Sequence, residues 1–415
     1  MIDTAKPLVR QEKPDVPMAW GRFVVLVLLI YTALRAFSTV VLLWITHTQQ
    51  DPVVFTGDNP RYFDVAALWD GQWYARIAEE GYPTALPLTQ AGLVAQNEWA
   101  FYPLFPMAAR VVMTLTGWPF AVAGTLLATA LGYGAAVVIA GLLREKVGSA
   151  GALGAVALWA GFPAAPVLQV AYTESLALLL LGGVLWLLIR RRWLWAAALA
   201  LLTGLARPIA LPLGLVALVA VIQRVRRRDA EPITAAETAG MVSSLAACAA
   251  SGLIWPVLVW ARTGQRDGYP ATMSAWRGGE QVALFTPTID VVQLVLGPSR
   301  GPWLLAGAAA LLFLAVLGPW AAGLGAELRA WTLGYPLYLL AALQPWTSTY
   351  RYLLLMFPLF VVFIGAGWAA DEARGRQPQW MLMVRTLVLL LLFLGWQVWW
   401  TWELFMFVPP RDNPP

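Results

Sequence analysis

Long apolar runs recur along this chain, and they constrain its fold more than any other feature. The runs at residues 23–45 and 176–189 show no alternation of apolar and polar side chains. A bilayer core of about 30 Å needs roughly 20 apolar residues in a helix to cross it, whereas a β-barrel is built from short alternating segments. With 60% of residues hydrophobic and 12% charged, the sequence predicts an all-α polytopic membrane protein.

Basic residues gather in short connections between these runs. The main groups are Arg144 with Lys146, the run 190–192 and the run 224–228. This distribution is typical of cytoplasmic loops under the positive-inside rule. Membrane topology therefore explains the formal net charge of +5, and we expect no nucleic-acid partner.

Following these charges from a cytoplasmic N-terminus predicts about 11 transmembrane helices in one domain, 1–415. A large first outer loop covers 46–118 and carries short interfacial helices, and a second outer loop covers 262–302. Because Pro103 and Pro106 interrupt residues 101–116, we expect this piece to lie along the outer surface or re-enter rather than cross. A composition rich in Arg, Ala, Leu and Trp favours a multi-pass protein of a bacterial plasma membrane.

Carboxylates are scarce in such a chain, and one of them stands among aromatic residues just after the first run. If 66–80 is a short helix, Asp70, Trp73 and Tyr74 share one face of it. Aromatic rings lower the local dielectric and can make a carboxylate a useful general base. Alternatively, Asp70 caps an interfacial helix whose aromatic residues belong to the membrane's aromatic belt.

Four more charged residues fall at predicted outer ends of the runs. Glu174 and Glu98 could cap helices or position a sugar hydroxyl. Arg207 and Arg351 could bind phosphate oxygens with the planar guanidinium fork, or anchor to lipid head groups. Together with Asp70, these residues meet the requirement of an extracytoplasmic active site, because distant parts of the chain converge on one surface.

Three other residues give less direct information. Arg35 lies near the middle of the first run, where a charge needs a protein partner or a polar cavity; a structural role and a substrate role are both open. The only histidine, His47, has no neighbours at metal-ligand spacing, and the only cysteine, Cys248, allows no disulfide. We expect no metal and no cofactor.

Three segments in order resemble the PIG-V family of membrane mannosyltransferases. Trp69-Asp70 with Ile-Ala-Glu-Glu-Gly-Tyr at 77–82 matches the first family pattern, Ala-Phe-Tyr-Pro-Leu-Phe-Pro at 100–106 the second, and Tyr-Thr-Glu-Ser-Leu at 172–176 the third. There are two departures. Leu68 stands where the family often has arginine, and the later Arg-Ser-Asn-Gly element keeps only its arginine, Arg207.

The resemblance implies a GT-C fold and transfer of a sugar, with inversion, from a polyprenyl-phosphate donor to a glycan, glycolipid or protein acceptor outside the membrane. The family's sugar is mannose, although an arabinose or glucose donor would leave a similar sequence. The implied base is Asp70, supported by Glu174 and Glu98, with Arg207 or Arg351 on the donor phosphate. The aromatic residues expected to line the substrate are Trp69, Trp73, Tyr74, Tyr82, Tyr102 and Tyr172.

Two alternatives use the same residues differently. A lipid or polyprenyl-phosphate transporter would use the arginines, including Arg35, to pass an anionic lipid. Such transporters commonly contain inverted repeats, and we find no internal repeat. A non-catalytic scaffold for cell-envelope assembly would not need the carboxylates at all.

Overall fold

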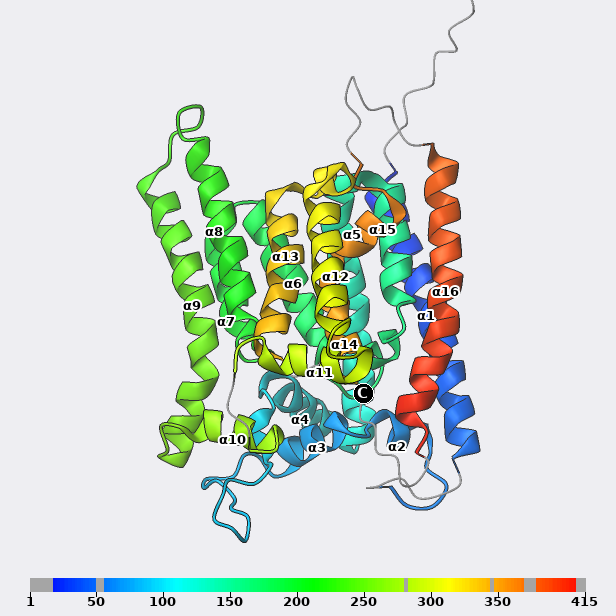
Figure 1. Ribbon diagram of the computed structural model, residues 1–415, viewed down its shortest axis with the longest axis vertical. Helices are drawn as coiled ribbons and strands as arrows, with labels where there is room; N and C mark the ends of the chain where they lie inside the picture. The colour runs from blue at the N-terminus through cyan, green and yellow to red at the C-terminus, as the bar shows by residue number, and fades with distance from the viewer. Residues whose placement is uncertain (1–17, 50–55, 280–282, 344–346, 369–377, 408–415) are drawn as a thin grey trace, which may run out of the picture.

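The computed structural model describes residues 18–49, 56–279, 283–343, 347–368 and 378–407 (Figure 1). These residues form helices and connections, with one isolated bridge between Leu88 and Val94 in place of any strand. The all-α prediction is confirmed. The N-terminal residues 1–17, for which the sequence predicts the cytoplasmic side, lie outside the described residues.

Four described helices are long and apolar enough to cross a membrane: α1 (Trp20–Thr48), α5 (Phe120–Ala160), α9 (Ala235–Thr263) and α16 (Gln379–Phe405). A fifth candidate is the pair α11 (Thr286–Leu296) and α12 (Gly301–Leu317), which is bent by 115° at its break. A membrane protein is thus supported, whereas the count of about 11 spans stays a prediction. The other main-body helices are α6 (Glu174–Ile189), α7 (Trp193–Thr203), α8 (Ala210–Arg226), α13 (Gly325–Ala342) and α15 (Pro358–Ile364).

Glycines shape this body where a helix breaks and where two helices approach closely. Helix α5 breaks at Gly148, whose φ of 75° and ψ of 175° favour glycine. A Cβ atom on Gly132 would lie 2.2 Å from the Tyr31 hydroxyl oxygen, and one on Gly204 would lie 2.3 Å from the Ser251 carbonyl oxygen. Small residues of this kind let helices approach closely in membrane bundles. They bring α1 against α5 and the end of α7 against α9.

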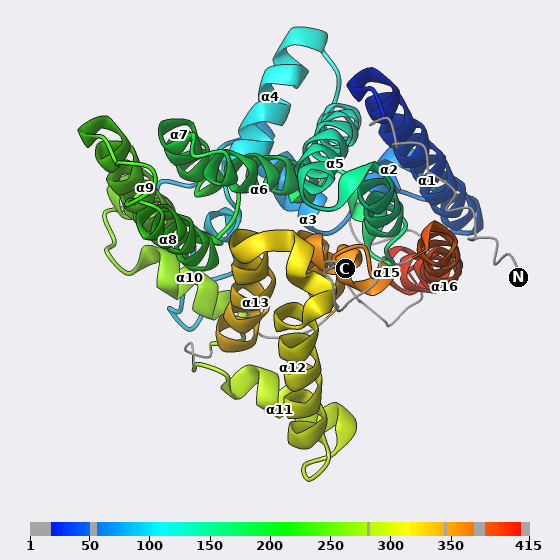
Figure 2. The ribbon, with the colours of Figure 1, turned by 90° about the horizontal axis from the view of Figure 1, so that it is seen from above.

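Short helices gather at one end of the body, opposite the turn that joins α8 to α9 (Figure 1). Helix α4 lies across the direction of the long helices and projects beyond α5 and α6 when seen from above (Figure 2). Its position along a bilayer surface stays a prediction. The short helices at this end are α2 (Tyr62–Ala66), α3 (Asp70–Glu79), η1 (Glu98–Ala100), α4 (Leu104–Thr116), α10 (Gly268–Trp276) and α14 (Thr349–Leu353).

The buried Arg35 has structural partners. Its Nη2 donates to the Ala160 carbonyl oxygen at 2.6 Å, and its Nη1 donates to the Ala165 carbonyl oxygen. Its guanidinium also lies 5.2 Å from the Tyr31 ring centroid. Because Ala160 ends α5, its carbonyl has no helical partner. Arg35 therefore satisfies the end of α5 within the bundle, which is the structural role that the sequence left open.

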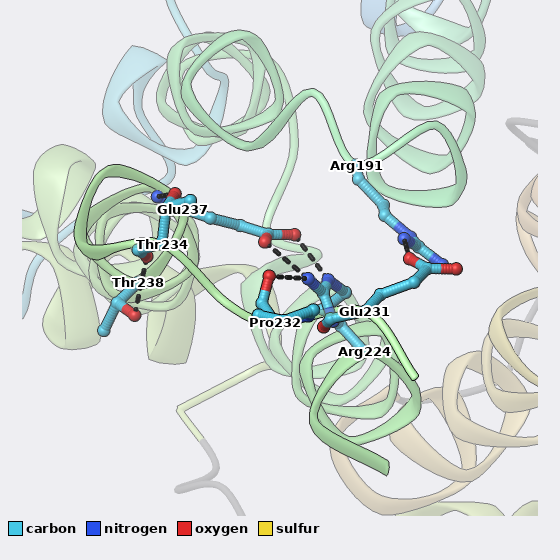
Figure 3. Close-up of polar contacts among 7 residues, drawn as sticks. All are labelled: Arg191, Arg224, Glu231, Pro232, Thr234, Glu237 and Thr238. Atoms are coloured by element: carbon cyan, nitrogen blue, oxygen red, sulfur yellow. Dashed lines mark hydrogen bonds and ion pairs between the residues drawn. The ribbon is translucent and has the colours of Figure 1, made fainter. Parts of the chain in front are cut away.

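Charged residues also hold the turn between α8 and α9 (Figure 3). Arg224 Nε and Nη2 donate to the two carboxylate oxygens of Glu237 at 2.6 and 2.8 Å. Arg224 Nη1 and Nη2 donate to the carbonyl oxygens of Glu231 and Pro232 at 2.9 and 3.2 Å. Thr234 caps α9, since its hydroxyl accepts the Glu237 N–H at 3.1 Å. Arg224 therefore fixes the structure of this turn.

The same turn is tied to the loop between α6 and α7. Arg191 forms an ion pair with Glu231 (Figure 3). The hydrogen bond from Arg191 is the main reason that the pKa of Glu231 lies below its usual value. The two connections that the sequence placed on one membrane side therefore contact each other.

Candidate active site at the outer end

Four elements that are distant in the sequence bring four charged side chains together. Asp70 begins α3 and Glu174 begins α6. Arg207 lies in the turn between α7 and α8, and Arg351 lies in α14. We call these four residues the outer cluster, after the membrane side that the sequence predicts for them. The structure thus joins four of the five charged residues that the sequence selected.

Backbone contacts place the carboxylates of the outer cluster. The Ala171 N–H donates to the Ala66 carbonyl oxygen at 2.8 Å, which ties the segment before α6 to the segment before α3. Trp69, directly before Asp70, has a φ of 58° and a ψ of −115°, an unusual conformation for a residue with a side chain. Its Nε1 donates to the Leu404 carbonyl oxygen at 2.9 Å. Helix α16 therefore holds the residue that sets the start of α3.

The outer cluster is a chain of alternating charges. Arg351 Nη1 pairs with Asp70 Oδ2 and lies 3.5 Å from Glu174 Oε1. Both terminal nitrogens of Arg207 lie 3.1 Å from the same Glu174 oxygen. With all four groups ionised, the two arginines balance the two carboxylates. The pairing lowers the high cost of burying each charge alone.

Two polar atoms of the outer cluster are buried without a hydrogen-bond partner. They are Glu174 Oε2 and Arg351 Nε. A buried polar atom left in this state costs about 1–3 kcal/mol. Most such atoms in folded proteins are paired, so these two need an explanation. A ligand that donates to one and accepts from the other would satisfy both.

Tyrosine rings surround the arginines. The Tyr352 ring centroid lies 4.7 Å from the Arg207 guanidinium carbon and 5.3 Å from that of Arg351. The Tyr172 ring lies 5.4 Å from Arg351, and its hydroxyl donates to the Leu68 carbonyl oxygen at 3.2 Å. Cation–π contacts of this kind stabilise a guanidinium where water is excluded. The tyrosines therefore hold the planar groups in fixed orientations.

Tyr74 also borders the outer cluster. Burial is the main cause that raises its pKa well above the usual value, and the charges of Asp70 and Glu174 raise it further. The Tyr74 phenol therefore stays protonated at any physiological pH.

Exposure falls from one end of the outer cluster to the other. The Asp70 side chain is 21% exposed, Arg207 10%, Arg351 6% and Glu174 0%. Asp70 is thus the member that an outside molecule reaches first, whereas Glu174 forms the buried base of the site.

No protein-family model matches this chain, and no curated protein shows significant similarity to it.

Glu98 does not belong to the outer cluster. It begins η1 and is half-buried. None of the ion pairs among the described residues includes it. The charge of Glu98 acts on Tyr82 instead. Burial is the main cause that raises the pKa of the Tyr82 phenol, and the charge of Glu98 raises it further. A supporting role of Glu98 in catalysis stays a prediction that this geometry does not favour.

The aromatic residues selected from the sequence divide into two groups. Tyr172 and Tyr74 border the outer cluster, as described above. Trp73 instead stacks on Phe101, with ring centroids 5.6 Å apart, and contacts Trp276 at 5.0 Å. The remaining ones pack against other parts of the protein: Trp69 in the main core, and Tyr82 and Tyr102 with Trp99 and Trp255.

The sequence analysis missed Tyr352, which contacts both arginines. Its signal was its position directly after Arg351, since arginine and tyrosine often stack. Metal ligation has no candidate group in the described part of the chain, where no three His, Cys, Asp or Glu side chains gather suitably. The only histidine, His47, lies in the last turn of α1 and is distant in the sequence from Asp70 and Glu174.

Proposed function

We propose that this protein is a membrane glycosyltransferase that moves a sugar from a polyprenyl-phosphate donor to an acceptor outside the membrane. Mannose is the first candidate sugar, because three ordered segments resemble the PIG-V family. The observation that carries the proposal is the outer cluster, in which Arg351 joins Asp70 to Glu174. Two of the resembling segments supply these carboxylates, and both contact arginines suited to phosphate.

The chemistry balances within the outer cluster. A bond forms between the acceptor oxygen and the anomeric carbon, while the bond from that carbon to the phosphate oxygen breaks. The departing electron pair leaves the phosphate with one more negative charge, and the acceptor proton passes to Asp70. Arg207 and Arg351 stabilise the charge that develops on the phosphate. The total charge of cluster and substrates is unchanged by the step.

Each residue has a role that fits its exposure. Asp70 is the most accessible member, so it is the group that an acceptor hydroxyl can approach as general base. Glu174 is fully buried and holds Arg207 through one oxygen. Its other oxygen, Oε2, is free to accept a hydrogen bond from a hydroxyl of the donor sugar. The arginines present fixed guanidinium groups to the phosphate between these two carboxylates.

Transfer from radiolabelled polyprenyl-phosphate mannose, catalysed by membranes that contain the protein, tests this function. We expect Asp70→Asn to lower the rate by about 10²–10⁴-fold, the usual range for a lost general base. Glu79→Gln is the matched control, because Glu79 is an exposed carboxylate on the same helix. Arabinose and glucose donors, run in parallel, identify the sugar.

Two results would contradict the proposal. Full activity of Asp70→Asn would remove Asp70 from the mechanism. Translocation of labelled polyprenyl phosphate in proteoliposomes, with no glycosyl product from any of the three donors, would favour the transporter instead.

A further inference from the structure

We propose that the donor phosphate displaces Asp70 from Arg351, so that the base becomes free only when the donor is bound. This inference rests on the proposed function. It adds an order to the reaction, in which the donor binds first and the acceptor proton is taken afterwards. The same residues therefore bind the donor and delay proton transfer until it is present.

The ion pair engages one of the two oxygens of the Asp70 carboxylate. Arg351 Nη1 donates to Asp70 Oδ2. An oxygen that accepts a hydrogen bond from a guanidinium is hindered from accepting the proton of an acceptor hydroxyl at the same lone pair. While this pair holds, proton transfer to Oδ2 is hindered and the carboxylate stays against Arg351.

Of the two carboxylates on Arg351, Asp70 is the one that can leave. Its side chain is 21% exposed, whereas that of Glu174 is fully buried and also contacts Arg207. A released Asp70 carboxylate would be stabilised by water. It would also be stabilised by the N-terminus of the ten-residue helix α3, of which it is the first residue. Glu174 also begins a helix, α6, but its side chain is 0% exposed, so water cannot stabilise it after release.

A phosphate group gains more from the arginines than Asp70 does. Arg351 Nε is buried and unpartnered, so a phosphate oxygen there would meet a donor that Asp70 leaves unused. Its neighbour Arg207 contacts the same Glu174 oxygen as Arg351, so both guanidinium groups lie within reach of one tetrahedral anion. Charge-assisted, bidentate contacts of arginine with phosphate are among the strongest hydrogen bonds in proteins.

Displacement also prepares the base. Once phosphate takes the place of Asp70, a new negative charge lies near the released carboxylate. Like charges at close range favour uptake of a proton by one of them. Donor binding therefore exposes the carboxylate and promotes its acceptance of the acceptor proton.

Binding of farnesyl phosphate to the purified full-length protein in detergent, followed by calorimetry, tests the competition. Removing the competing carboxylate should strengthen binding: we expect Asp70→Asn to tighten it by about tenfold, and Asp70→Ser to act in the same direction. Arg351→Gln should weaken binding by at least about tenfold, and Asp70→Asn should give no gain in that background. Glu79→Gln serves as the control with unchanged affinity, and farnesol as the uncharged ligand.

The outcomes separate the two proposals. Wild-type binding of farnesyl phosphate over farnesol, with no gain in Asp70→Asn or Asp70→Ser, would overturn the displacement and leave the glycosyltransferase intact. Equal binding of farnesyl phosphate and farnesol by the wild type and every variant would overturn the phosphate site, and with it the donor class of the proposed function.

Discussion

Two clusters at opposite ends of this protein each contain two arginines and two carboxylates, yet they differ in completeness. In the cluster at the α8–α9 turn, Arg224 uses all three of its side-chain nitrogens, and Glu237 uses both oxygens. In the outer cluster, Arg351 Nε and Glu174 Oε2 have no partner although both are buried. The first cluster is complete in itself, whereas the second has free polar atoms for a ligand.

The two clusters also differ in access to water. Stability alone would favour exposing a carboxylate with an unpaired oxygen, yet Glu174, which has one, is the buried carboxylate. The carboxylates at the α8–α9 turn are 20% and 52% exposed, so water can compensate any lost contact there. Glu174 has no such access. A protein gains little stability from burying incompletely paired charges. The comparison teaches that the outer cluster is explained better by function than by folding.

The largest expected effect compares one carboxylate from each cluster. Glu174→Ala leaves two buried arginines short of counter-charge, so it should lower the free energy of unfolding by about 3–5 kcal/mol. Glu237→Ala should cost clearly less, because Arg224 keeps two carbonyl acceptors and the Glu237 side chain is itself 20% exposed. Unfolding of both variants in detergent measures the difference. Equal losses would show that the two clusters are of the same kind.

A smaller effect concerns the residue that positions Asp70. Trp69→Phe removes the hydrogen bond to the Leu404 carbonyl oxygen and should lower stability by about 1 kcal/mol. Because Trp69 also holds an unusual backbone conformation next to Asp70, the transfer rate should fall by about tenfold while the KM for the donor stays unchanged. The control is Trp195→Phe, since Trp195 is an exposed tryptophan on α7. An equal loss of rate in both variants would remove this role from Trp69.

The smallest effect is a pH dependence at the α8–α9 turn. The hydrogen bond from Arg191 holds the pKa of Glu231 below its usual 4.5. A carboxyl with a lowered pKa in the folded state stabilises it fully above the unfolded value, and this contribution is lost as the pH falls through the folded pKa. Arg191→Gln should therefore lower Tm slightly at pH 7 and have no effect well below pH 4.5. The effect is small because the Arg191 side chain is 33% exposed and that of Glu231 52%, so solvent screens the pair.

Thermal unfolding between pH 7 and acid checks this dependence. Arg192→Gln is the matched control, since Arg192 is an exposed neighbour. A Tm difference between Arg191→Gln and the wild type that persists in acid would show that Arg191 acts by another contact.

The outer cluster illustrates how far sequence reasoning reached. The sequence pointed to Asp70 and Glu174 because carboxylates are scarce in an apolar chain. It pointed to Arg207 and Arg351 because these arginines stand at the ends of apolar runs. Glu98 met the same conditions but lies outside the cluster. Position at the end of a run places a residue on one side of the membrane, and it does not say which neighbours the residue contacts there.

For the fold, local sequence determined most of what could be predicted. A helix in an apolar environment satisfies its own backbone, so a long apolar run is enough to predict one. This is why the predicted run 23–45 lies within α1 and the run 176–189 lies within α6. The number of helices that cross the membrane needs lengths and bends, such as the 115° bend between α11 and α12, and the apolar pattern alone does not give these.

The sequence by itself thus determined that the chain is helical and that it suits a membrane, and it selected five charged residues as candidates for a site: Asp70, Glu98, Glu174, Arg207 and Arg351. Only the tertiary structure decided that Arg351 lies between Asp70 and Glu174, that Tyr352 contacts both arginines, and that two buried polar atoms of the outer cluster have no partner. The physical reason is that charge pairing acts across space. It depends on how the ends of α3, α6, α7 and α14 meet, and no local pattern in the sequence records that arrangement.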